Sequence, residues 1–397
     1  MKTLYFKFTF IMVSFLITAH AQQAKKTTEA NNIFSKGTVN FTNRPNVAVT
    51  SFKSVVNGDP KSYDIRIDPS IFIADGLAIG IDARISGNSS KNTKASFHSW
   101  QTDLTLTYGH KITGPLNGYI KLFAGPGQSK SEFDISTQGN NPQKLTAKYF
   151  DVKGLIGFPL ALPGDGSACF TPYFSYDYYT TKTTTNNFTD KTFAFGVKLE
   201  SYIQKGMGAG KMSEEILKTA YKKGANFIEF NSIAGVSSDS RQQTQIGSTT
   251  QIAKQKITSS NISLGYNYYI INDVAVGLNF SYNSTKMGYV GTTSSKTSTV
   301  MFGPVVTAQV PVEGPLHNAF AQAAYSFGTY KDPKKKLSDF SIKAGYNIFL
   351  TKYLTFTPKI GYEKLKGKVP QGVSGIPYEN SGLVVEMGVR AWLNLWK

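Results

Sequence analysis

Polar and apolar residues alternate one by one along much of this 397-residue chain. In one segment Trp100, Leu104 and Tyr108 fall on one face, while Gln101 and Asp103 fall on the other. A period of two predicts β-strands, because successive side chains of a strand point to opposite faces of the sheet. The alternating segments are about 9–11 residues long, which is the length a tilted strand needs to cross a bilayer. We therefore expect an all-β chain whose strands span a membrane.

The N-terminus carries the features of a secretory signal peptide. Lys2 and Lys7 flank the start of a mostly apolar stretch at residues 8–18, and Ala-His-Ala at residues 19–21 matches a small-residue cleavage site. The apolar stretch is too short for a transmembrane helix, and no later run of 18 apolar residues occurs. These features predict an exported protein and argue against a helical membrane protein. The lone Cys169 argues against an internal disulfide framework and a cysteine-based metal site.

The second half of the chain repeats landmarks of the first half in the same order. Gly-Pro-Leu at residues 114–116 returns at residues 314–316, and Phe-Thr-Pro at 170–172 returns at 356–358. Ordered repetition of this kind predicts an internal duplication. Eight alternating segments can be placed in each half, near residues 38–52, 61–73, 77–86, 97–109, 118–126, 146–158, 168–180 and 191–203, and near 225–237, 256–270, 274–284, 297–310, 318–329, 337–349, 353–364 and 382–394.

Short and long connections alternate between these segments. Asn272-Asp273 reads as a tight turn, whereas residues 127–144, 181–190, 238–255 and 367–381 read as long polar loops. Tight turns on one side and long loops on the other are typical of outer-membrane barrels, and the even strand count places both termini on the periplasmic side. The expected organisation is a signal peptide at residues 1–21, a periplasmic lead-in at 22–36, a first eight-stranded unit at 37–203, a linker with a short helix at 204–223, and a second eight-stranded unit at 224–397.

A duplication of eight strands permits two architectures. The linker at residues 204–223 includes a short helix with Ser213 as its N-cap, and it resembles the stretch before the first strand. Each unit therefore has its own lead-in and its own eight strands in the sequence. We expect a transmembrane antiparallel fold of two tandem eight-stranded up-and-down β-barrels, each narrow enough to be filled by side chains. One sixteen-stranded barrel is the alternative.

The export signal, the eight alternating strands per unit and the terminal segment Gly-Val-Arg-Ala-Trp-Leu-Asn-Leu-Trp at residues 388–396 resemble small OmpA-type outer-membrane β-barrel domains of Bacteroidetes-like bacteria. The resemblance covers nearly all of the mature chain as a pattern rather than a signature motif. Such proteins commonly end on Phe, whereas this chain ends on Trp396-Lys397. The resemblance implies an integral outer-membrane protein that contacts outer-membrane lipid and lipopolysaccharide and is inserted by the outer-membrane assembly machinery.

Charged residues occupy the strand faces that should point into the barrel. Because buried charges must pair or stay hydrated, we expect them to form ion pairs that seal a narrow interior. The alternative is the lining of a gated or selective pore, which needs a wider lumen. The predicted interior charges are Asp64, Arg66, Asp82, Arg84, Asp103, Asp151, Lys153, Lys198, Glu200, Lys343, Lys359, Glu386 and Arg390.

The sequence offers no catalytic residue, cofactor site or metal site that we can single out. His98 and Ser99 are adjacent on a strand, so they point to opposite faces and cannot share a proton directly. The formal net charge of +18 lies largely on loop lysines, and export argues against a nucleic-acid partner. We predict a non-enzymatic outer-membrane protein with a structural or surface role, such as envelope integrity, adhesion or lipopolysaccharide contact. The alternative is a porin-like transport channel formed by a single sixteen-stranded barrel.

Overall fold

The structure is a computed structural model. It describes residues 32–42, 48–54, 61–90, 95–113, 116–133, 143–161, 168–183, 186–204, 220–230, 234–245, 251–289, 294–310, 318–331, 335–351, 353–368 and 378–393. No helix in these residues is long and apolar enough to cross a membrane. The predicted signal peptide and the helix predicted to begin near Ser213 lie outside the described residues.

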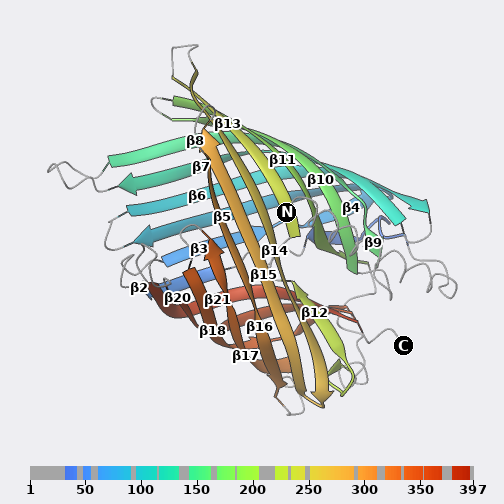
Figure 1. Cartoon of the computed structure of the whole chain (residues 1–397). Helices are drawn as coiled ribbons and strands as arrows, with labels where there is room; N and C mark the ends of the chain where they lie inside the picture. The colour runs from blue at the N-terminus through green and yellow to red at the C-terminus, as the bar shows by residue number, and fades with distance from the viewer. Residues whose placement is uncertain are drawn as a thin grey trace.

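The described residues form 21 strands that belong to one sheet, and every pairing is antiparallel (Figure 1). In chain order the strands are β1 (Val39–Thr42), β2 (Ala48–Ser54), β3 (Lys61–Ile67), β4 (Ser70–Ala74), β5 (Leu77–Ser90), β6 (Ala95–Thr113), β7 (Leu116–Phe133), β8 (Gln143–Gly157), β9 (Leu160–Ala161), β10 (Ala168–Lys182), β11 (Asn186–Ile203), β12 (Asn226–Phe230), β13 (Ala234–Gln245), β14 (Gln251–Ile271), β15 (Val274–Tyr289), β16 (Ser295–Gln309), β17 (Ala319–Lys331), β18 (Lys335–Tyr346), β19 (Ile348–Thr351), β20 (Leu354–Lys368) and β21 (Tyr378–Trp392).

The alternation in the sequence becomes an alternation of burial. On β6, Asp103, Thr105 and Thr107 are buried, while Leu104 and Leu106 between them are exposed. The same pattern places a belt of exposed apolar side chains on the outward face of the sheet; it includes Ile79, Ile81, Leu122, Phe150, Val152, Phe174, Tyr176, Phe193, Leu278, Phe280, Phe302, Phe327, Ile342, Ile360, Tyr362 and Leu383. An inverted pattern, polar inside and apolar outside, is the arrangement that a bilayer stabilises. The predicted all-β, antiparallel barrel fold is confirmed.

At one end of the molecule, here called the outer end, the long strands close into a single circuit. Neighbours pair in chain order from β2 and β3 to β20 and β21, and β21 then pairs with β2. The two halves meet at two seams. At one, Thr50 of β2 lies opposite Val384 of β21; at the other, Phe193 of β11 lies opposite Ser238 of β13. The circuit at the outer end therefore contains sixteen strands.

At the opposite end, here called the base, each half closes on itself. Val39 of β1 pairs with both Ile71 of β4 and Ile203 of β11, so β1 closes a ring that runs from β4 to β11. Likewise Ile228 of β12 pairs with both Tyr266 of β14 and Ala391 of β21, so β12 closes a second ring. We call the two closed halves lobe 1 (β1–β11) and lobe 2 (β12–β21).

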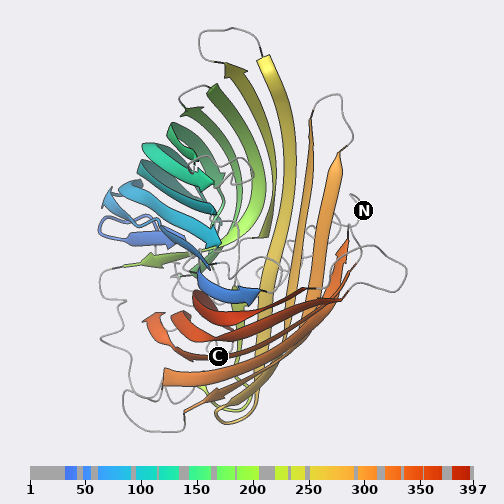
Figure 2. The same ribbon diagram turned by 90° about the vertical axis from the view of Figure 1, so that its left-hand side faces the viewer.

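The branch between the two ends is built from the first strand of each lobe. The sequence predicts single strands near residues 38–52 and 225–237, whereas the structure divides them into β1 and β2 and into β12 and β13. The lower segment pairs within its own lobe, and the upper segment pairs with the last strand of the other lobe. The two architectures considered from the sequence thus occur at opposite ends of one sheet. Figure 2 shows the blue-to-green strands of lobe 1 and the orange-to-red strands of lobe 2 as two curved walls.

The strands extend farther at the outer end than the sequence predicts. Residues 127–144 were expected to form a loop, but β7 continues to Phe133 and β8 begins at Gln143. The expected loops at residues 181–190, 238–255 and 367–381 are shortened in the same way. These extensions are polar, so hydrophobic alternation does not reveal them. Pairing between neighbouring strands continues past the apolar belt.

The branched pairing predicts a specific cross-link between the lobes. In a Cys169→Ala background, Thr50→Cys with Val384→Cys should form a disulfide, because directly opposed antiparallel residues have Cα atoms about 4.5–5.5 Å apart. The yield is measured on folded protein in lipid vesicles by the mobility difference with and without reductant.

The matched control joins Thr50→Cys to Thr192→Cys. If β2 continued the register that β1 makes with β11, in which Thr42 lies opposite Glu200, residues 50 and 192 would face each other. Efficient cross-linking of this second pair, with none between residues 50 and 384, would contradict the sixteen-stranded circuit and indicate two fully separate barrels.

Candidate functional site

The base of lobe 1 is filled by the turn that precedes β1. Phe34 is 1% exposed, and its ring centroid lies 5.5 Å from that of Phe72 and 5.9 Å from that of Tyr202. The Phe34 carbonyl accepts a hydrogen bond from the backbone nitrogen of Gly76 at 2.8 Å. Gly37 has a φ of 85°, a conformation that glycine adopts without steric cost, and it lets the chain reverse from the turn into β1. The turn at residues 32–38 therefore fills the base of this lobe, and we call it the plug of lobe 1.

Lobe 2 has an equivalent plug. Tyr221 is 2% exposed, and its carbonyl accepts a hydrogen bond from the backbone nitrogen of Asp273 at 2.8 Å. Gly224, with a φ of 94°, occupies the place that Gly37 has in lobe 1. The ring of Tyr221 packs 5.7 Å from that of Trp392, which is fully buried near the end of β21.

The hydroxyl of Tyr221 is also held inside the base. It donates to Asn318 Oδ1 at 3.0 Å and accepts from Asn347 Nδ2 at 3.3 Å. Burial raises the pKa of Tyr221 well above its ordinary value, so the hydroxyl stays protonated and remains a donor. Phe34 has no such group, which makes the plug of lobe 2 more polar than that of lobe 1.

Above the first plug, Glu200 is the centre of a buried polar cluster. It lies 2.8 Å from Lys198 Nζ, and it accepts hydrogen bonds from the hydroxyls of Tyr119 at 2.8 Å, Thr171 at 2.6 Å and Tyr202 at 3.2 Å. The side chains of Lys198 and Glu200 are both 2% exposed. A buried carboxylate with this many donors is well compensated for its loss of water.

The base of lobe 2 contains a larger ionic network. Glu229 pairs with Lys359 and accepts from Arg390 Nε at 3.0 Å. Lys359 Nζ also lies 2.7 Å from Glu386 Oε1, and the second oxygen of Glu386 lies 3.0 Å from Lys343 Nζ. The guanidinium of Arg390 also stacks over Phe227 and Phe320, with centroid distances of 4.5 and 4.0 Å. Such contacts stabilise a guanidinium that has been removed from water.

The charges of lobe 1 continue toward the outer end in smaller groups. Arg84 Nε donates to Asp64 at 2.9 Å, and Arg66 donates to Asp82 through two nitrogens. Gln101 bridges two carboxylates, donating to Asp103 at 2.9 Å and to Asp151 at 2.8 Å. Lys153 lies 3.9 Å from Asp177. The pairs become more exposed in this direction, since the Arg84 and Asp64 side chains are 46% and 32% exposed.

The structure brings ten of the thirteen predicted interior charges into four ion-paired groups, whereas Asp103 and Asp151 are bridged by Gln101 and Lys153 lies near Asp177. The four groups are Arg66 with Asp82; Arg84 with Asp64; Lys198 with Glu200; and Lys343 and Lys359 with Glu386, with Arg390 joined to this last group through Glu229. The interior charges also contact four residues that the sequence did not single out: Gln101, Asp177, Glu229 and Glu363, which lies 3.4 Å from Lys343 Nζ. Glu229 alternates with Ile228 and Phe230, so its inward position was readable from the same period of two.

The described residues contain no group of three or more His, Cys, Asp and Glu arranged to hold a metal ion. His98 and Ser99 have separate partners. His98 Nδ1 lies 2.9 Å from the Tyr63 hydroxyl, whereas Ser99 Oγ lies 2.7 Å from Ser86 Oγ. The two side chains therefore belong to different faces of β6, as expected for adjacent residues of a strand.

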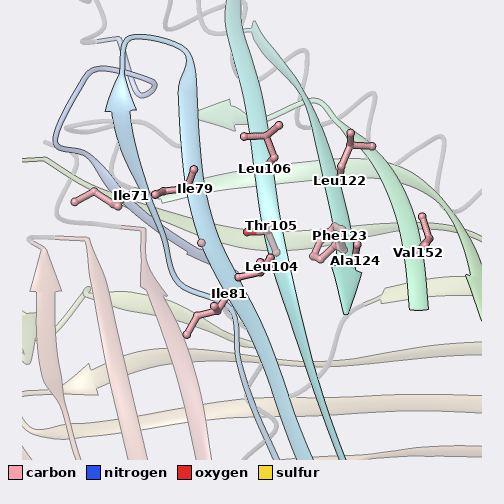
Figure 3. Close-up of a pocket in the computed structure, with 11 residues that line it drawn as sticks. Ile71, Ile79, Ile81, Leu104, Thr105, Leu106, Leu122, Phe123, Ala124 and Val152 are labelled. Atoms are coloured by element: carbon pink, nitrogen blue, oxygen red, sulfur yellow. The ribbon is translucent and has the colours of Figure 1, made fainter. Parts of the chain in front are cut away.

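Lobe 1 also has an apolar hollow of about 840 Å³, lined by residues of β4 to β8 (Figure 3). Its lining includes Ile79, Leu104, Leu122 and Val152, which belong to the outward apolar belt. The hollow offers almost no polar group to orient a soluble ligand. Lipid tails are the chemistry that it fits.

No protein-family model matches this chain, and no curated protein matches it either. Solved structures give remote likenesses. The CymD monoaromatic hydrocarbon channel is 7% identical with a TM-score of 0.36, covering 94% of this chain and 92% of that one. CdiB from Acinetobacter baumannii is 9% identical with a TM-score of 0.37, covering 89% and 60%. A Pseudomonas aeruginosa FadL homologue is 11% identical with a TM-score of 0.28, covering 94% of each. All three TM-scores are below 0.5.

Glu229 provides a direct test of the network at the base of lobe 2. Replacing it by Gln leaves Lys359 and Arg390 buried with one carboxylate fewer, and this should lower the free energy of unfolding by about 3–5 kcal/mol. The measurement is urea unfolding in lipid vesicles, followed by tryptophan fluorescence.

The matched control is Glu379→Gln at the outer end. Glu379 also contacts two cations, Lys364 at 2.5 Å and Lys366 at 3.2 Å, but its side chain is 42% exposed. Its replacement should leave the unfolding midpoint nearly unchanged, because water solvates the released lysines. Equal effects of the two substitutions would contradict the assignment of Glu229 as the buried centre of the network.

Proposed function

We propose that this chain is a non-enzymatic, integral protein of the bacterial outer membrane whose two lobes are closed at the base. Its role is structural or one of surface interaction, and it does not form an open diffusion pore. The observation that carries the proposal is the filling of each base by a plug and by buried ion pairs. Phe34 and Tyr221, at 1% and 2% exposure, are packed inside the bases of lobe 1 and lobe 2.

The outward apolar belt supports the membrane location. Side chains such as Leu104 and Leu278 are 72% and 66% exposed, and in water a surface of this kind would be covered by a partner or would aggregate. In a bilayer these side chains need no cover, while closure of the sheet pairs the backbone groups. The predicted signal peptide and the tight turns favour an outer membrane with the base on the periplasmic side.

We also infer that the two lobes are copies of one OmpA-type unit. The lead-in turns support this, because they make matching hydrogen bonds. Gly37 N donates to Phe72 O at 2.7 Å in lobe 1, and Gly224 N donates to Tyr269 O at 2.9 Å in lobe 2. Lys36 N and Lys223 N bind the side chains of Asp75 and Asn272 in the same way. A plug delivered before the first strand would then be part of the ancestral unit.

Single-channel recording in planar bilayers tests the closed base. The refolded mature chain should give no large, stable current steps. The double variant Phe34→Ala, Tyr221→Ala should give frequent brief openings, because it removes both plug side chains. Far-UV circular dichroism and protease protection establish that each protein is folded and inserted.

Phe302→Ala is the control for the loss of an aromatic ring at a lipid-facing position, where Phe302 is 48% exposed. It should stay as silent as the unmodified protein. Large, salt-dependent steps from the unmodified chain would overturn the proposal and indicate the alternative, a porin-like channel that uses the sixteen-stranded circuit along its whole length.

A further inference from the structure

Lysines gather on the outward face of the sheet near the outer end. They lie on strands of both lobes, beyond the apolar belt and on the same face as it. We call this set the lysine collar: Lys130, Lys144, Lys148, Lys182, Lys191, Lys256, Lys286, Lys296, Lys331, Lys336, Lys364, Lys366 and Lys368.

The side-chain period of the strands fixes the direction of the collar. On β8, Lys148 is two residues from Phe150, which is 51% exposed in the belt, so both point outward. On β18, Lys336 and Ile342 likewise share the outward face. The collar therefore faces the surroundings of the barrel and not its lumen.

Three pairs of collar lysines lie directly opposite each other on neighbouring strands. Lys148 of β8 faces Lys182 of β10, Lys286 of β15 faces Lys296 of β16, and Lys336 of β18 faces Lys368 of β20. Side chains opposed in this way have Cβ atoms about 4.5–5.5 Å apart, and like charges there destabilise the pairing. All six side chains are exposed, and none has an acidic partner among the described residues.

The acidic residues near the collar do not offset these pairs. Glu132 contacts Lys144 at 3.1 Å, and Glu379 contacts Lys364 and Lys366. Each carboxylate is thus held by lysines outside the three opposed pairs. Repulsion within the pairs calls for an anion from outside the chain, and an ammonium pair is well suited to a phosphate group.

We infer that the lysine collar binds the phosphate groups of anionic lipid headgroups, with one phosphate held by each opposed pair. The inference rests on the proposed membrane location, since the apolar belt sets the level at which the headgroups lie. Lipid tails cover the belt, and the headgroups of the same lipids meet the collar beyond it. Binding from the outer leaflet would hold the barrel at a fixed depth, and lipids on several strands would form an annulus around both lobes.

The experiment uses the full mature chain refolded into phosphatidylethanolamine vesicles that contain diphosphoryl lipid A. Lipid A that remains bound after detergent extraction is counted by native mass spectrometry over a titration. The variant Lys286→Gln, Lys296→Gln should bind at that pair roughly twenty-five-fold more weakly, since each lysine near a membrane surface contributes about fivefold. The variants of the other two pairs should behave alike.

Lys222→Gln, Lys223→Gln is the matched control, because it removes two exposed lysines at the base. It should bind lipid A like the unmodified chain. Lipid A without phosphates should bind weakly to every protein, and inorganic phosphate should compete poorly because it lacks the tails that the belt holds. Equal losses in the collar and base variants, or undiminished binding of dephosphorylated lipid A, would overturn the inference. Complete displacement by inorganic phosphate would also overturn it, by indicating a site for free phosphate.

Insertion is measured separately, by protease protection in vesicles of phosphatidylethanolamine alone. If the unmodified chain failed to insert there or in lipid A vesicles, the proposed membrane location would be wrong. If it inserted while the collar variants and the unmodified chain bound lipid A equally, only the collar inference would be wrong.

Discussion

The need to pair every backbone group inside a membrane shapes this molecule. An open sheet edge in a bilayer leaves amide and carbonyl groups without water or a partner, so the sheet must close. This chain closes it differently at its two ends. At the base, β1 and β12 close their own lobes; at the outer end, β2 and β13 join the lobes through β21 and β11. Each last strand therefore serves two partners along its length, and the described strands leave no free edge between the lobes.

The narrow bases and the wider outer circuit have different interiors for a simple geometric reason. An eight-stranded ring is just narrow enough for side chains to meet across it, whereas a sixteen-stranded one is not. In the bases, Glu200 and Glu229 accordingly find several donors each and lie almost fully out of solvent. Farther out, pairs such as Arg84 with Asp64 stay partly hydrated. Ion pairing that holds the base closed is therefore compatible with a hydrated space above it, and the same inward row of charges serves both regions.

Much of the fold follows from the period of two, because the sequence must satisfy lipid on one face and a polar interior on the other. That is why the strands near Trp100 and Leu383, and inward charges such as Arg66 and Glu386, could be predicted. The pairing of strands at the two seams could not be predicted. β11 and β21 present the same outward alternation, Phe193 with Phe195 and Leu383 with Val385, so β2 could pair with either by pattern alone. The strand extensions were missed for a related reason: beyond the lipid, polar residues occupy both faces, and the contrast that reveals a strand disappears.

The charges on the two faces obey the same electrostatics in different surroundings. Inside the base, a lysine such as Lys359 lies between Glu229 and Glu386, because a buried cation without carboxylates would be too costly. On the outer face, Lys286 and Lys296 are opposed without a carboxylate, which is tolerable only where water or an external anion reaches them. Carboxylates of the chain therefore neutralise the interior lysines, whereas the opposed collar lysines depend on anions or water from the surroundings. This difference separates the charges that stabilise the barrel from those available to bind something else, and it places the binding surface on the outside of the outer end.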